Sequence, residues 1–272
     1  MLQSVYDDGI NPFRFGFHAA PVPRDESEFR SNPSAAYWLR WEEIFEHAKR
    51  GDFKRTPELI DIYDHGDSTL QGACYFLMAF AGSSVCLDQL RDRILCPPTL
   101  ISHIDFCKSL VMSGCLTYLP AVIEAYVRLF REGMSELEMI PVRLRYMLSD
   151  PAHILDDNQS IEDFSKNALI RYHQLVDRLG SNQISIFSGE MVAPQFFSQQ
   201  LLLGAKSGNY LMFAPLRLIL EAFTGWDFSG VFKANSPRPL DTSSLVEEFL
   251  ESGEASNYVP GIRYFWGHRI FE

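Results

Sequence analysis

The sequence lacks the short patterns by which common catalytic, cofactor and metal sites are recognised. Its seven histidines form no H-x-x-x-H or H-E-x-x-H pair, and its five cysteines form no C-x-x-C pair. Neither G-x-x-x-x-G-K-[ST] nor G-x-G-x-x-G occurs, so the usual phosphate-binding loops are not expected. Ser188-Gly189 is not preceded by the glycine of a G-x-S-x-G nucleophile turn. We therefore expect no catalytic residues, no metal, no cofactor and no enzymatic activity.

Long apolar runs and an excess of positive charge are also missing. The stretches 73–81 and 201–203 are far shorter than the roughly 20 apolar residues of a membrane span, and the first residues contain no apolar signal core. We expect a cytoplasmic protein with reduced, mostly buried thiols. The net charge of −11 repels phosphate and anionic lipid, which predicts no nucleic-acid and no membrane partner, and it attracts cationic proteins. The acidity alternatively serves solubility alone.

What the sequence does contain is apolar residues at helical spacing. In the first such segment Trp38, Trp41, Ile44 and Phe45 lie three or four residues apart, and Gly51 follows as a helix stop. Residues 226–242, with two prolines, are expected to form a loop. The segments expected to be helical are 35–51, 57–63, 68–82, 87–95, 99–114, 115–133, 135–150, 162–180, 194–208, 209–226 and 243–253.

The passage 56–82 predicts a helical hairpin. Thr56 is expected to cap a short helix that has Pro57 at its first position, and Gly66 to end it. Asp67 or Ser68 then caps a longer helix rich in small residues. Because similar units recur every 35–45 residues or so, we predict an all-α fold of stacked antiparallel hairpins, a HEAT-like irregular solenoid. Residues 1–33, with four prolines, are expected to form an irregular arm packed on a single helical domain, 34–272, which ends in an aromatic tail.

Carboxylates gather at turns, where they could contact a basic partner. Asp61, Asp64 and Asp67 surround the turn of the hairpin, and Asp156 and Asp157 lie in an acidic loop. Complementary charge accelerates association and fixes the register of a complex, which makes these five residues candidate partner contacts. They equally fit an ordinary solvated face.

The C-terminal tail concentrates aromatic residues with arginine. Arg263, Tyr264 and Trp266 are of the types that form hot spots in protein interfaces, and we include them among the candidate partner contacts. The alternative is a terminal plug docked over the last helix, with its arginines paired to nearby acids.

Three segments resemble the helical immunity proteins of bacterial polymorphic toxin systems. They are AAYWLRWEEIFEHAKRG (35–51), TPELIDIYDHGDSTLQGACYFLMAFAG (56–82) and YVPGIRYFWGHRI (258–270). The resemblance implies a HEAT-like cytoplasmic antidote without activity of its own, which neutralises a cognate toxin domain by direct contact. The acidity of the chain fits a basic nuclease as that toxin.

Two other functions remain open. A helical-repeat adaptor or scaffold would bind several unrelated partners through a similar body. An enzyme would have to assemble its site from scattered residues such as Asp64, His65 and His103.

Overall fold

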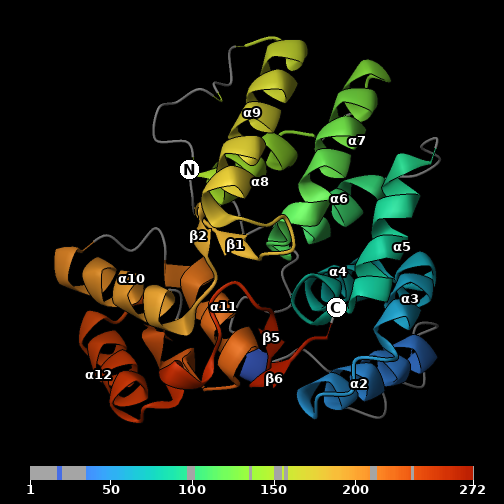
Figure 1. The fold of residues 1–272 in the computed structure, drawn as a ribbon. Helices are drawn as coiled ribbons and strands as arrows, with labels where there is room; N and C mark the ends of the chain where they lie inside the picture. Colours follow the sequence, from blue (N-terminus) through green and yellow to red (C-terminus); the bar gives the residue numbers. More distant parts are fainter. Residues whose placement is uncertain are drawn as a thin grey trace. The chain divides into compact units, whose positions relative to one another are not determined.

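A computed structural model describes residues 17–19, 35–96, 102–134, 137–149, 155, 159–208, 213–233 and 236–271. Within these residues the chain forms eleven α-helices, with a few 3₁₀ turns and three two-stranded hairpins (Figure 1). The predicted predominantly helical class is confirmed. None of these helices combines the length and the apolar character that a bilayer span requires.

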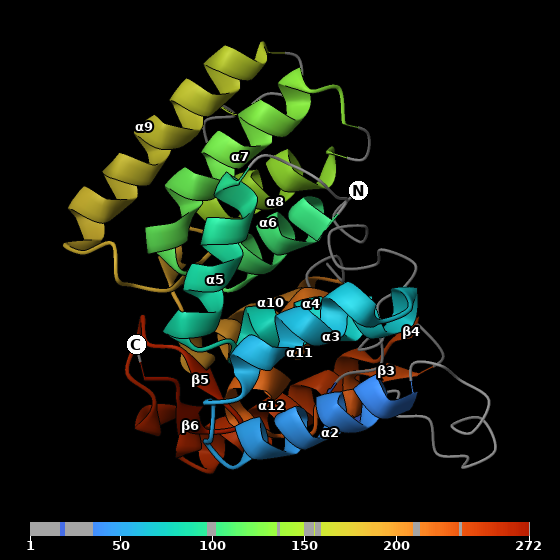
Figure 2. The same ribbon diagram turned by 90° about the vertical axis from the view of Figure 1, so that its right-hand side faces the viewer.

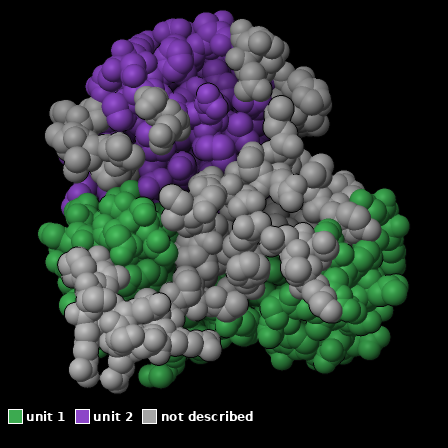
Figure 3. Space-filling view, turned by 180° about the vertical axis from the view of Figure 1, so that it is seen from behind, with its two compact units in different colours: residues 1–83, 193–272 green, residues 84–192 purple. Residues whose placement is uncertain are grey.

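The chain divides into two compact units (Figure 3). Unit 1 joins the two ends of the sequence, Met1–Ser83 and Ala193–Glu272, and unit 2 is the intervening Ser84–Val192. The expectation of one domain over 34–272 stays a prediction. Of the predicted arm 1–33, only residues 17–19 lie within the described residues.

Unit 1 is built around two adjacent helices, α4 and α11. Helices α2 and α3 pack beside α4 (Figure 2), whereas α10 contacts both α11 and α12. The elements of unit 1 are η2 (Phe17–Ala19), α2 (Ala35–Lys49), η3 (Thr56–Glu58), α3 (Leu59–His65), α4 (Ser68–Ala81), α10 (Pro194–Ser207), α11 (Phe213–Thr224), η5 (Ser229–Val231), β3 (Phe232–Lys233), β4 (Ser236–Pro237), α12 (Pro239–Glu251), η6 (Glu254–Asn257), β5 (Tyr264–Phe265) and β6 (His268–Arg269).

Unit 2 consists of two rows of helices. Along one row α5 contacts α7 and α7 contacts α9, and in the other row α6 contacts α8 (Figure 2). The elements are α5 (Ser84–Leu95), α6 (Ser102–Met112), η4 (Leu116–Tyr118), α7 (Leu119–Arg131), α8 (Met139–Leu148), α9 (Ile161–Leu179), β1 (Ile186–Phe187) and β2 (Glu190–Met191). The turn between β1 and β2 has positive φ at both Ser188 and Gly189, the geometry of a type I′ hairpin.

The hairpin of α3 and α4 forms where the sequence predicts it, but only one of its expected caps is correct. The Asp67 carboxylate accepts a 2.9 Å hydrogen bond from the backbone N–H of Leu70 and caps α4, as expected. Thr56 does not cap a helix. It is fully buried at the start of η3, and its hydroxyl donates to the Phe53 carbonyl at 2.9 Å.

The prediction of a loop over residues 226–242 is wrong for its last residues. Helix α12 begins at Pro239, four residues before the expected start at Ser243. Proline at the first position of a helix costs no hydrogen bond, because the first backbone N–H groups of a helix have no partner within it.

Loss of the Asp67 cap should weaken the α3–α4 hairpin measurably. Asp67→Ala is expected to lower the unfolding free energy by about 1 kcal/mol, because the Leu70 N–H loses its acceptor. Asp67→Asn supplies an equivalent acceptor and should unfold like the wild type. Urea titration followed by circular dichroism measures both variants, and equal losses in the two would show that charge rather than capping is involved.

The core is rich in aromatic side chains, and the described part of the N-terminal arm is integrated into it. The Phe17 ring is 2% exposed and packs against Phe45, Phe80, Phe265 and Trp266, with ring centroids 5.5 to 6.2 Å apart. The arm is therefore anchored in unit 1 at this position.

The cysteines are free thiols, and all except the exposed Cys96 are buried. Burial raises the pKa of the Cys107 thiol to about 12, so this sulfur stays protonated and unreactive.

Candidate protein-binding surface

The predicted acidic cluster at the hairpin turn is largely occupied by contacts within the chain. Asp61, on α3, lies 2.9 Å from Nη1 of Arg40 on α2 and 3.3 Å from Nδ1 of His65. Asp67 is engaged as the cap of α4. Asp64 is exposed at the end of α3. The turn thus presents less free negative charge than the sequence suggests.

The acidic loop cannot be assessed in the same way. Asp156 and Asp157 lie outside the described residues. Their role as partner contacts stays a prediction.

The arginine of the tail lies inside unit 1. Arg263 is 3% exposed, and its Nη1 and Nη2 atoms donate to the carbonyls of Gly82 and Ala79 at 2.7 and 2.9 Å. These carbonyls end α4, so the tail packs on unit 1, but on the ends of α4 and α11 rather than over the last helix, and its buried arginine pairs with helix-end carbonyls rather than with acids. Tyr264 is also buried, and its hydroxyl accepts a hydrogen bond from the backbone N–H of Val259.

The turn of the β5–β6 hairpin, called the tail hairpin below, donates hydrogen bonds to the end of a second helix. The backbone N–H groups of Trp266 and Gly267 donate to the carbonyls of Ala222 and Phe223 at the end of α11, at 2.7 and 2.8 Å. Trp266 is partly exposed, and its ring contacts Phe17 and the imidazole of His18. The tail hairpin therefore supplies donors to the last carbonyls of both α4 and α11.

The residues considered for a scattered catalytic site have different surroundings. Asp64 and His65 are exposed on α3 in unit 1, whereas His103 is 5% exposed on α6 in unit 2. Among the described residues, no group of three or more His, Cys, Asp or Glu side chains is arranged to hold a metal ion.

A buried pair of opposite charges joins the N-terminal arm to α11. The Glu221 side chain is fully buried, with Oε1 4.0 Å from Nε of Arg217 and Oε2 accepting a 2.8 Å hydrogen bond from the backbone N–H of Phe17. Burial raises the pKa of Glu221 to about 7, although Arg217 and the Phe17 N–H oppose the shift. Burial also lowers the pKa of Arg217.

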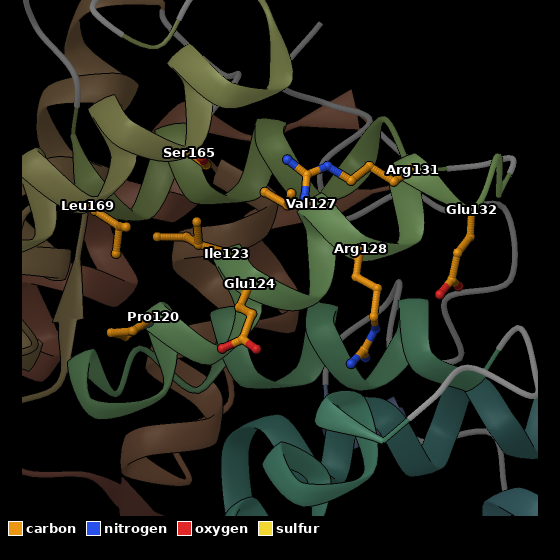
Figure 4. A pocket seen from close by; sticks show the side chains of 9 residues that line it. All are labelled: Pro120, Ile123, Glu124, Val127, Arg128, Arg131, Glu132, Ser165 and Leu169. Carbon is orange, nitrogen blue, oxygen red and sulfur yellow. The ribbon is translucent and has the colours of Figure 1, made fainter.

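Unit 2 contains an open groove with an apolar floor between α7 and α9 (Figure 4). It has a volume of about 650 Å³. Ile123 and Val127 of α7 and Leu169 of α9 form the floor, with Pro120 at one end and Ser165 on the side of α9.

One rim of the groove carries charged residues at every fourth position of α7. Glu124, Arg128 and Glu132 extend from the same side of the helix (Figure 4). Arg128 turns to the end of α5, where its guanidinium donates to the carbonyls of Leu95, at 2.7 Å, and of Ile94.

The carboxylates of this rim remain available to solvent. Glu124 and Glu132 are exposed, and their carboxylates form no hydrogen bond or ion pair with the described residues. On the opposite side, Arg131 is paired with Glu162 of α9 at 3.1 Å, and this arginine lowers the pKa of the Glu162 carboxyl. Arg128 keeps its positive charge, so the groove together with Glu162 carries a net charge of −1.

The sequence contains a signal for this groove in the apolar residues of α7. The apolar residues Leu119, Val122, Ile123, Tyr126 and Leu129 fill the buried face of α7. Val127 lies one turn after Ile123, at the edge of this face and next to the charged residues, and Pro120 is the second residue of the helix. Apolar residues that interrupt a polar helix face indicate a surface that contacts something beyond the helix itself.

Neither a model of a known protein family, nor a curated protein, nor a solved structure matches the chain.

Proposed function

We propose that this protein is a non-enzymatic binding protein that neutralises a cognate bacterial toxin domain by direct contact. The observation that carries the proposal is how its charges are distributed. The net charge is −11, and many of the described arginines are already engaged within the chain. Arg40, Arg55, Arg91, Arg131 and Arg178 all pair with carboxylates. The chain therefore keeps an excess of carboxylates over cations, and this excess attracts a basic protein.

The two rows of helices in unit 2 support the scaffold that the proposal assumes. Contacts of α5 with α7 and of α7 with α9, beside contacts of α6 with α8, are those that a stack of helical hairpins would make. HEAT-like stacks of this kind act as binding surfaces, and inhibition by such a surface needs buried area and a few strong contacts but no chemistry.

The partner proposed here is a toxin domain with a basic surface, such as a nuclease that binds phosphate backbones. Such an enzyme carries arginine and lysine around its active site. An acidic protein that covers this site competes with the substrate for the same cations. The association rate constant should then be high at low salt and should fall markedly as the salt concentration is raised.

The test is co-expression with the product of the adjacent gene. The proposal requires that the two proteins copurify as a stoichiometric complex and that the protein restores growth to cells that express the toxin domain. Absence of both a complex and rescue would rule the function out. Recovery of several unrelated proteins would favour a scaffold instead.

A further inference from the structure

We propose that the groove between α7 and α9 is a docking site for an amphipathic helix with basic flanks, contributed by the partner protein. The inference deepens the proposed function and rests on it for the identity of that partner. Its physical basis lies in the groove itself: its length, its apolar floor and the sign of its free charges.

The length of the groove fits a helix. It follows α7 from Pro120 to Glu132, which at 1.5 Å per residue is roughly 18 Å. An elongated, open channel of this length accepts about three turns of a second helix. Ile123, Val127 and Leu169 form an apolar strip against which leucine-type residues at helical spacing would pack.

The charges along the groove determine which residues should flank the apolar face of the docked helix. Arg131 is neutralised by Glu162, whereas Arg128 keeps its charge but turns its guanidinium to the carbonyls of Ile94 and Leu95. Glu124 and Glu132 remain, two exposed carboxylates separated by two turns of α7. A docked helix with lysine or arginine at matching positions would pair with both, whereas an acidic helix would be repelled.

A stapled amphipathic peptide of roughly four turns, with leucine on one face and lysine on its flanks, serves as the probe. Stapling is needed because an isolated helix of this length is marginal in water. Calorimetric titration into the full-length protein should show binding that weakens with salt. The same peptide with glutamate flanks should bind much more weakly.

The decisive comparison uses two double variants of equal charge. Glu124→Lys/Glu132→Lys should bind the lysine-flanked peptide about tenfold more weakly than the wild type. Glu247→Lys/Glu251→Lys changes two exposed carboxylates of α12 and alters the net charge by the same amount. It should retain the wild-type affinity within about twofold. Circular dichroism checks that both variants fold.

Each other outcome overturns the groove as the helix site. Equal losses in the two double variants would mean that the peptide responds only to net charge. A photocrosslinker at the centre of the peptide should label residues within 120–132 or 165–169, and labelling elsewhere would place the site elsewhere. Self-association of the protein that Glu124→Lys/Glu132→Lys abolishes would assign the groove to a second copy of the chain.

The result also separates this inference from the proposed function. If the copurified partner binds both double variants equally well, the groove inference fails while the binding function stands. If no toxin partner is found but the peptide still binds at the groove, the toxin assignment fails and the docking site stands.

Discussion

Replacing Arg263 with methionine is expected to lower the unfolding free energy by about 3 kcal/mol and the melting temperature by about 5 °C. The guanidinium donates to the carbonyls of Ala79 and Gly82. Both lie at the end of α4, where carbonyls have no intrahelical donor. Methionine preserves apolar volume but leaves these two buried acceptors unpaired. Urea titration followed by circular dichroism and by tryptophan fluorescence measures the loss.

Two further variants separate the hydrogen bonds from the charge. Arg263→Lys keeps the charge, but a single ammonium cannot reproduce the planar fork that reaches both carbonyls, so we expect an intermediate loss. Arg269→Met removes an exposed arginine from β6 of the same hairpin and should change stability by no more than about 0.5 kcal/mol. If Arg263→Met unfolds like Arg269→Met, the buried contact contributes nothing.

The effect of Arg263 should extend beyond the tail, because the same hairpin also closes α11. Trp266 and Gly267 donate to the last carbonyls of that helix. When the tail loosens, amide hydrogen exchange should accelerate at the ends of both α4 and α11. Exchange confined to residues 258–271 would show that the two helix ends are stable without the tail.

The helical elements could be predicted from the sequence because their signals are local. The stripe of Trp38, Trp41, Ile44 and Phe45 gives α2, and Asp67 caps α4 three residues before the amide it binds. Thr56 was misassigned because a residue before proline suits an N-cap in sequence. In the structure its hydroxyl instead satisfies the Phe53 carbonyl and lies 3.1 Å from the Ser83 hydroxyl.

The candidate surface was harder to predict, because charge neutralisation is decided by contacts distant in sequence. Asp61 is paired with Arg40, 21 residues earlier, and Arg263 binds carbonyls more than 180 residues away. From the sequence alone, Asp61 and Arg263 are therefore predicted to be charges that a partner can contact. In the sequence Glu124 and Glu132 look neutralised by the nearby arginines of α7, whereas in the structure Arg128 contacts carbonyls and Arg131 contacts Glu162.

Glu221 is expected to make stability depend on pH near neutrality. An ordinary glutamate has a pKa of 4.5, and burial raises that of Glu221 to about 7. The folded state therefore binds a proton more tightly than the unfolded state. The resulting stabilisation is complete below pH 4.5 and is lost as the pH rises through 7. Since one pKa unit corresponds to 1.4 kcal/mol, the loss amounts to roughly 3 kcal/mol.

Glu221→Gln should flatten this dependence between pH 5 and 8. Glutamine still offers an oxygen to the Phe17 N–H but does not titrate, so the slope of unfolding free energy against pH is the readout. Other charged groups nearby are Arg217, Asp227 and His18. The pKa of Asp227 is lowered, so it loses its proton well below this range. Urea titrations at several pH values measure the slope.

The matched control is His18→Gln, because His18 belongs to the same described segment of the arm as Phe17 and its Nε2 atom lies 2.9 Å from the Gly225 carbonyl. If Glu221 is the titrating group, His18→Gln keeps most of the wild-type slope while Glu221→Gln removes it. The opposite pattern would transfer the effect to His18.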